Sequence, residues 1–188
     1  MLDVEVSPKE GAYNWDPQVP TLAIRVFDVL TCRDGTPERD QKGNLMPQAY
    51  FPLKHMMKKE FVRIEQLIFD DVERDGRGFP ANFVPFNTTH ATAILDAFDT
   101  WKDKLGAVYV HCVMGLSRSP AIALALREIY GIHGPKWDAL STDFITTRNR
   151  HVLITMLETA DERRQHYRTP PIMGVKRPPN YLPKYRSP

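Results

Sequence analysis

The chain has 188 residues and a formal charge of +2, which fits one domain or one domain with a tail. Hydrophobic residues make up 42% of it, enough for a core, and this excludes a fully disordered chain. The near balance of 25 basic and 23 acidic residues argues against nucleic acid as a partner. No apolar run approaches the ~18–20 residues of a membrane-spanning helix, and the first residues do not resemble a secretory signal. We therefore expect a cytoplasmic protein without a membrane span.

Residues 168–188 differ in composition from the rest of the chain. They contain five basic residues, no acidic residue and six of the sixteen prolines. Without them, 20 basic and 23 acidic residues remain, so the body carries a net charge of −3. A proline-rich segment of this kind is extended rather than helical. We predict a single domain over residues 1–167 and a basic, proline-rich tail over residues 168–188, whose partner is unknown.

The first half of the chain contains three segments with strand character. Leu2–Val6 has the length of a short edge strand and is followed by a weak helix from Pro8 to Asn14. Thr21–Val29 is an apolar run that predicts a buried strand. In Phe61–Phe69, apolar and polar residues alternate before the segment becomes fully apolar, as in a strand that enters a core. The polar segment 31–57 between them is long for a connection, so it is either a functional lid or an insertion.

The second half alternates between helix and strand. Thr88 or Thr89 can cap a helix whose apolar residues recur at helical spacing as far as Leu105. Ala107–Val110 is a short apolar strand of the kind found at the centre of a covered sheet. An apolar helix over Ala121–Tyr130 and an apolar helical stripe from Val152 to Ala160 follow. This order predicts an α/β fold with a central, mostly parallel sheet flanked by helices.

The segment HCVMGLSRS, residues 111–119, lies between a predicted central strand and a helix, where ligands bind in open α/β sheets. Cys112 and Arg118 are separated by five residues, so the loop can curl and aim backbone N–H groups at an anion. The helix N-terminus adds positive charge, which favours both a bound phosphate and a Cys112 thiolate. Arg118 can grip two phosphate oxygens. The predicted ligand is an oxyanion such as phosphate, sulfate or vanadate, and the predicted loop comprises Val113, Met114, Gly115, Leu116, Ser117 and Arg118.

This HC-x5-R-S segment resembles the signature of the cysteine-dependent protein tyrosine phosphatases, and its SRSP continuation resembles the dual-specificity branch. The stretch from Thr21 to Ala160 also resembles small bacterial and phage tyrosine phosphatases, in which a strand ending in Phe-Asp-Asp precedes the HC strand. Here Phe69-Asp70-Asp71 stands in that place. The resemblance implies hydrolysis of a phosphomonoester through a phosphocysteine intermediate, without a metal or a cofactor.

The resemblance also implies roles for individual residues. Cys112 would attack phosphorus, and Ser119 would help its thiolate leave in the second step. His111 would order the loop and favour the thiolate without being the acid. Asp71 is expected to protonate the leaving oxygen and then to activate water, with Asp70 as the alternative acid. Asp75 is a more distant candidate.

The substrate class is less sharply indicated than the chemistry. Residues 113–117 include no lysine, which disfavours a phosphoinositide or inositol phosphate, and the basic residues near 53–63 do not form the broad face that an RNA 5′-phosphate needs. A related cysteine phosphatase that acts on a phosphoinositide or an RNA 5′-phosphate stays as an alternative. A phosphorylated protein or peptide, with phosphotyrosine first and dual specificity open, is the expected substrate. Phe79, Phe83 and Phe86 either line a slot for the aromatic ring or close the core. A phosphate-binding relative without turnover is the alternative from another class.

Overall fold

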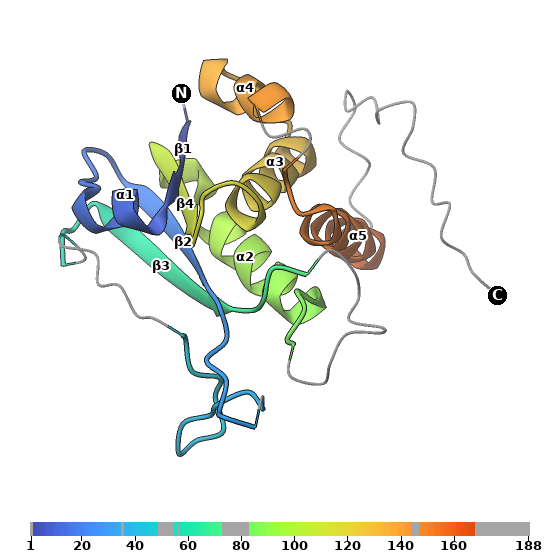
Figure 1. The fold of residues 1–188 in the computed structure, drawn as a ribbon. Coiled ribbons are helices and arrows are strands. Elements are labelled where there is room, and N and C mark those ends of the chain that lie inside the picture. The colour runs from blue at the N-terminus through green and yellow to red at the C-terminus, as the bar shows by residue number, and fades with distance from the viewer. Residues whose placement is uncertain are drawn as a thin grey trace.

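The computed structural model describes residues 2–34, 36–48, 55, 57–72, 83–143 and 147–167 (Figure 1). The predicted tail over residues 168–188 lies outside the described residues, and so do Asp75 and Phe79. The boundary predicted near Tyr167 therefore stays a prediction.

The described strands form one four-stranded sheet in the order β1-β4-β2-β3, with every neighbouring pair parallel. This confirms the predicted α/β fold with a central parallel sheet. Because the strands run in the same direction, their carboxyl ends meet at one edge of the sheet. Their bounds are Asp3–Pro8 for β1, Thr21–Phe27 for β2, Phe61–Ile68 for β3 and Ala107–Cys112 for β4.

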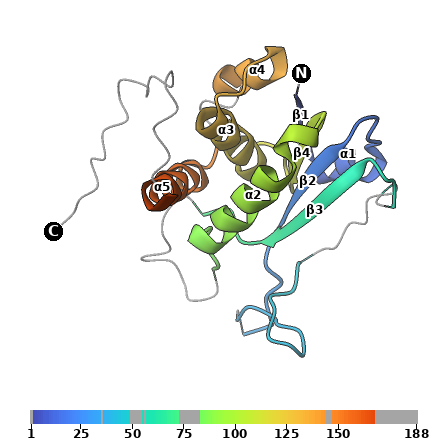
Figure 2. The same ribbon diagram turned by 180° about the vertical axis from the view of Figure 1, so that it is seen from behind.

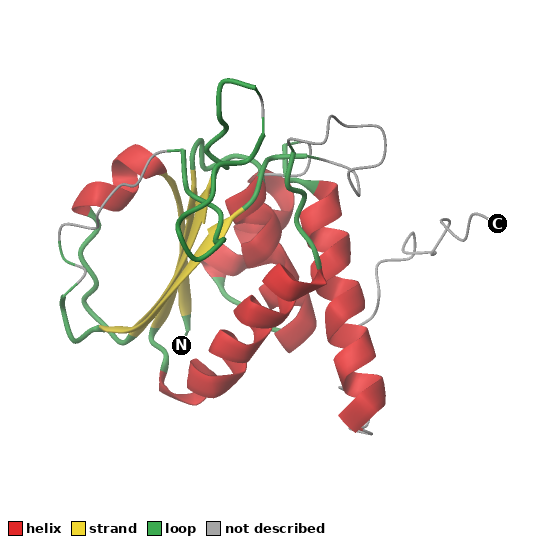
Figure 3. Ribbon diagram, turned by 90° about the horizontal axis from the view of Figure 1, so that it is seen from below, coloured by secondary structure: helices red, strands yellow, loops and turns green. Residues whose placement is uncertain are grey.

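Helices cover both faces of the sheet (Figures 1 and 2). The short α1 packs against β1 and β4 on one face, whereas α2 and α3 cover the other face and α4 packs against β1 and α3. Helix α5 lies against α2 and α3 on the side away from the sheet (Figure 3). The helices span Lys9–Asn14, Thr88–Trp101, Arg118–Tyr130, Pro135–Asp143 and Arg150–Tyr167, with a short 3-10 turn at Lys102–Lys104.

Alternate residues of β4 enter different cores, as expected for a strand buried on both faces. Val108, Val110 and Cys112 belong to the large core under α2, α3 and α5. Tyr109 packs in a smaller cluster with Ala12 of α1. The side chains of Cys112 and of the preceding His111 therefore lie on opposite faces of the sheet.

Several helix boundaries differ from the sequence prediction. Asn87, not Thr88 or Thr89, caps α2, because its side chain accepts hydrogen bonds from the amides of Thr89 and His90 at 3.0 and 3.2 Å. The predicted helix over Ala121–Tyr130 begins three residues earlier, at Arg118, since a proline at position 120 is tolerated in a first turn. The short α4 has few buried apolar residues and was not predicted.

The polar segment after β2 includes a folded arm over residues 29–34 and 36–47, which projects from the edge of the sheet at the bottom of Figure 1. Isolated antiparallel bridges join Val29 to Pro47, Thr31 to Pro37 and Arg39 to Leu45. Near its tip, Asp40 accepts hydrogen bonds from the amides of residues 42 and 44 at 2.8 and 2.9 Å. The arm is rooted at the edge of the sheet where β2 ends.

Candidate active site

The loop over residues 112–118 joins the last residue of β4 to the first residue of α3. Gly115 has φ +70°, and a Cβ at this position would lie 2.6 Å from the backbone nitrogen of Pro8. Because that neighbour is backbone, it cannot move aside as a side chain would, so the loop requires glycine here. The loop therefore packs tightly against the end of β1.

Cys112 is buried at the start of this loop, with 1% of its surface exposed. Its Sγ lies 3.1 Å from Oγ of Ser119, the second residue of α3. The N-cap residue Ser117 makes no side-chain capping bond, so no such bond occupies the first amides of α3. A helix start of this kind suits an anion. Met114 and Leu116, in contrast, are 67% and 50% exposed.

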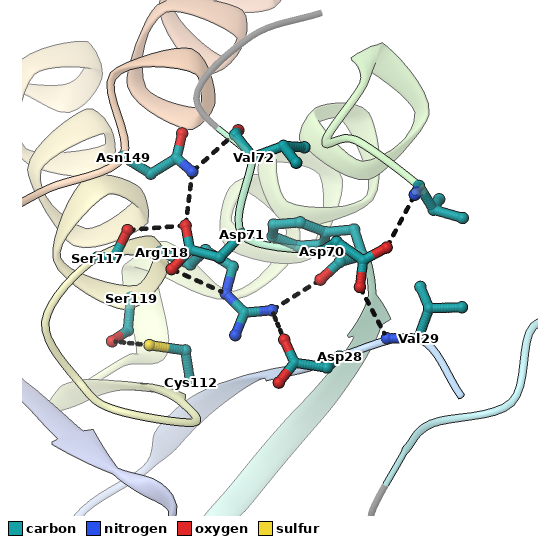
Figure 4. A network of polar contacts seen from close by, with 12 residues as sticks. Asp28, Val29, Asp70, Asp71, Val72, Cys112, Ser117, Arg118, Ser119 and Asn149 are labelled. Carbon is teal, nitrogen blue, oxygen red and sulfur yellow. Dashed lines mark hydrogen bonds and ion pairs between the residues drawn. The ribbon is translucent and has the colours of Figure 1, made fainter. Parts of the chain in front are cut away.

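Arg118 is 3% exposed and is held from two neighbouring strands (Figure 4). Its Nη1 donates to the carbonyl of Phe69 at 2.7 Å and pairs with Oδ1 of Asp28 at 2.6 Å. Its Nε lies 3.8 Å from Oδ2 of Asp71 and makes no hydrogen bond within the described part of the chain. Nη1 of Arg118 is thus bound by the protein, and the guanidinium has other N–H groups that can donate hydrogen bonds to an anion.

Asp71 contacts the loop directly. Its Oδ1 accepts hydrogen bonds from the Ser117 hydroxyl at 2.8 Å and from the side-chain amide of Asn149 at 2.7 Å. The carboxylate remains 38% exposed. These two donors and Arg118 hold the carboxylate beside the loop, where a ligand could reach it (Figure 4).

Asp70 has different partners from Asp71 despite being its neighbour. Its two carboxylate oxygens accept from the amides of Val29 at 3.3 Å and Val84 at 2.9 Å, and its own amide donates to the Val84 carbonyl at 2.8 Å. The side chain therefore joins the segment after β2 to the segment before α2. Of the two candidate acids, the structure brings Asp71 to the Cys112–Arg118 loop.

Two polar residues of this site were not predicted from the sequence. Asp28 directly follows β2, and a carboxylate at the carboxyl end of a strand was a signal that could have been used. Asn149 is fully buried and caps α5 by accepting from the Val152 amide at 3.0 Å. Its own backbone amide donates to the Ser117 carbonyl at 3.1 Å. A cap before an apolar helical stripe was predictable, but its contact with Asp71 was not.

His111 lies on the opposite face of the sheet from Cys112. It is 1% exposed, and its Nε2 accepts a hydrogen bond from Nε of Arg25 at 3.0 Å. Burial, and then the charge of Arg25, lower the pKa of His111 to about 3. The ring is thus neutral at pH 7, so it has no charge of its own with which to favour a Cys112 thiolate.

The aromatic residues expected before α2 have different environments. Phe86 is 1% exposed and packs edge-on against Phe69 in the core, whereas Phe83 is 41% exposed. Within the described residues, no group of three or more His, Cys, Asp or Glu side chains could hold a metal ion. No helix in that part of the chain is long and apolar enough to cross a membrane.

No protein-family model and no curated protein matches the sequence. Similar solved structures include PTPMT1 in complex with PI(5)P, at 14% identity over 78% of this chain and 81% of that chain, with a TM-score of 0.41. A human tyrosine phosphatase-like serine/threonine/tyrosine-interacting protein is 15% identical over 88% of this chain and 93% of that chain, with a TM-score of 0.42. A second structure of PTPMT1 is 17% identical over 89% of this chain and 96% of that chain, with a TM-score of 0.44. These proteins have the cysteine-dependent dual-specificity phosphatase fold. At such low identities and TM-scores the similarity supports no conclusion about function, which depends on the site itself.

Proposed function

We propose that the chain is a phosphomonoester hydrolase that acts through a phosphocysteine intermediate on Cys112, with a phosphotyrosine protein or peptide as its substrate. One observation carries the proposal. Three groups meet at one edge of the sheet: Cys112 at the end of β4, Arg118 at the start of α3, and the Asp71 carboxylate, which is hydrogen-bonded to the loop between them.

In the first step, Arg118 and the uncapped start of α3 bind the phosphate oxygens. The Cys112 thiolate attacks phosphorus, an S–P bond forms, and the P–O bond to the leaving group breaks. Asp71, protonated for this step, gives its proton to the departing oxygen. Its contact with the Ser117 hydroxyl at 2.8 Å keeps it beside the loop that would hold the phosphate.

In the second step, water attacks phosphorus and Asp71 takes its proton. The S–P bond breaks and the thiolate leaves. The Ser119 hydroxyl lies 3.1 Å from Sγ of Cys112, so it can donate a hydrogen bond to the sulfur as negative charge returns to it. Free phosphate and the original enzyme are the products.

The exposed side chains of the loop itself favour phosphate on an apolar or aromatic group. Met114 and Leu116 are the exposed side chains of the loop, and neither is charged. A polyanionic substrate would meet no lysine between Cys112 and Arg118. Phosphotyrosine offers one phosphate and an aromatic ring, and phosphoserine or phosphothreonine proteins remain a second, dual-specificity class.

The test is hydrolysis of p-nitrophenyl phosphate by Cys112→Ser, with Cys32→Ser as the matched control, because Cys32 is exposed on the arm. We expect Cys112→Ser to lose about 10³-fold or more in kcat, and Cys32→Ser to stay close to the unchanged protein. Full turnover by Cys112→Ser would refute the covalent mechanism. Vanadate binding by the unchanged protein without turnover would favour the phosphate-binding alternative instead.

A further inference from the structure

Arg25 is a charged side chain inside the protein. It lies on β2, it is fully buried, and its Nε donates to Nε2 of His111 at 3.0 Å. The two residues are register partners on adjacent strands, so the contact follows from the pairing of β2 with β4. Because arginine keeps its charge when buried, this face of the sheet holds a permanent positive charge in contact with His111, the residue before Cys112.

The contact determines where His111 carries its proton. A guanidinium can only donate hydrogen bonds, so Nε2 of His111 has to accept, and the neutral ring then carries its proton on Nδ1. The pKa of His111, lowered by burial and by Arg25, agrees with a neutral ring at pH 7. Nδ1 is itself buried and has no hydrogen-bond partner among the described residues.

Among the described groups on this face of the sheet, no second cation contacts His111. On its own strand, the Tyr109 ring lies 5.9 Å from the imidazole between centroids, and burial raises the pKa of Tyr109 to about 12. From β1, the Ser7 hydroxyl lies 2.5 Å from the Tyr109 oxygen, and the Glu5 carboxylate acts on the same phenol. Helix α1 contributes Ala12. Among these described groups, Arg25 is the cation that His111 contacts.

On the other face, around Cys112, the ion pairs among the described residues join Arg118 of α3 to Asp28 after β2 and to Asp71 after β3. Nη1 of Arg118 is 2.6 Å from Oδ1 of Asp28 and its Nε is 3.8 Å from Oδ2 of Asp71, so the Asp28 carboxylate already offsets charge on Arg118 before any phosphate binds. A thiolate and a phosphate dianion each add further negative charge. A second buried cation, in contact with the residue that precedes Cys112, offsets part of this charge.

We propose that Arg25 is a positioning residue for the Cys112–Arg118 loop: it orients the neutral imidazole of His111 and adds a buried positive charge that stabilises the Cys112 thiolate. The inference rests on the proposed function, in which that thiolate is the nucleophile. Arg25 lies on the far face of the sheet, so it acts through His111 and through its charge rather than by touching substrate.

The test compares Arg25→Met, which removes the charge and the donor, with Arg25→Lys, which keeps the charge. Both are made in a Cys32→Ser background, so that iodoacetamide reports Cys112 alone. Against the Cys32→Ser parent, we expect Arg25→Met to slow alkylation about tenfold near pH 6 and little at pH 9. Arg25→Lys should regain most of the loss near pH 6. Identical pH profiles for Arg25→Met and the parent would overturn the proposal.

A second measurement keeps the proposal falsifiable if Arg25→Met fails to fold. Two-bond ¹H–¹⁵N correlations on the unchanged protein should show His111 with its proton on Nδ1 at pH 7 and no titration of the ring above about pH 5. A proton on Nε2, or a charged ring at pH 6, would overturn it. Neither readout requires turnover, so a failure here is distinct from a failure of the Cys112→Ser test.

Discussion

Asp70 and Asp71 are adjacent in sequence, but their carboxylates have unrelated partners. Asp71 binds Ser117 and Asn149 beside the loop, whereas Asp70 binds two backbone amides in other segments. A general acid must reach the leaving oxygen of the substrate. A carboxylate that only joins two backbone segments by hydrogen bonds does not have to reach it. At the scale of single residues, the difference in partners therefore predicts a chemical role for Asp71 and a structural role for Asp70.

We predict that Asp71→Asn lowers kcat/KM on a phosphotyrosine peptide by about 10²–10⁴-fold, since a tyrosyl oxygen needs a proton as it leaves. The loss should be smaller on an aryl phosphate with a very acidic phenol. The basic limb of the pH–rate profile should flatten, because that limb reports loss of the acid's proton.

The matched control is Asp70→Asn. Its main expected effect is on stability, because two backbone amides lose a charged acceptor. If Asp70→Asn shows the dependence on leaving group and Asp71→Asn does not, the two roles are exchanged. If neither variant shows it, the acid lies elsewhere in the chain.

The buried, neutral ring of His111 predicts how the free energy of unfolding depends on pH. Its pKa is about 3 in the folded protein and near 6.5 when exposed, so the unfolded chain binds more protons between these values. The contribution of His111 should therefore lower the free energy of unfolding by about 2 kcal/mol as the pH falls from 6.5 to 4.5. Urea unfolding at both pH values should show that loss in the unchanged protein and a smaller one in His111→Gln. Equal losses would contradict the burial of a neutral ring.

At the scale of elements, the loop over residues 112–118 is held by its contact with the end of β1. Gly115→Ala places a Cβ against the backbone of Pro8, so the loop must move. Gly43→Ala is a close control, because Gly43 also has positive φ, at +82°, but no atom within 4 Å of the added Cβ. Both variants pay the backbone strain, about 1–2 kcal/mol.

We expect Gly115→Ala alone to lose activity, by about tenfold or more in kcat/KM on p-nitrophenyl phosphate, since small displacements of a catalytic loop are costly. The measurement is steady-state kinetics together with urea unfolding of both variants. Equal activity in the two variants would mean that the packing against β1 does not set the geometry of the loop.

Local patterns made the main elements predictable, and also the position of the Cys112–Arg118 loop between β4 and α3. The apolar runs of β2 and β4 and the spacing from Cys112 to Arg118 lie within short stretches of sequence. Contacts between distant segments were not predictable in this way. Asp28, Asn149 and Arg25 contact Arg118, Asp71 and His111 only because parallel pairing and helix packing bring them there, and nothing adjacent in sequence marks those contacts.

At the scale of the whole molecule, the composition of residues 168–188 separates a predicted tail from the domain. Deletion after Tyr167 should leave the midpoint of thermal unfolding and the turnover of p-nitrophenyl phosphate close to those of the full chain, because the tail lacks core-forming periodicity. Circular dichroism and kinetics on both proteins provide the comparison. A fall of more than about 5 °C in the midpoint would place the domain boundary further along the chain.

The central claim is that a phosphoryl group passes through Cys112. Ser119→Ala offers the most direct measurement, because removing the hydroxyl 3.1 Å from Sγ should slow the second step more than the first. On rapid mixing with p-nitrophenyl phosphate, this variant should release a burst of about one p-nitrophenol per enzyme, and mass spectrometry after quenching should locate phosphate on Cys112. A burst with the phosphoryl group on another residue, or with no covalent adduct, would contradict the account.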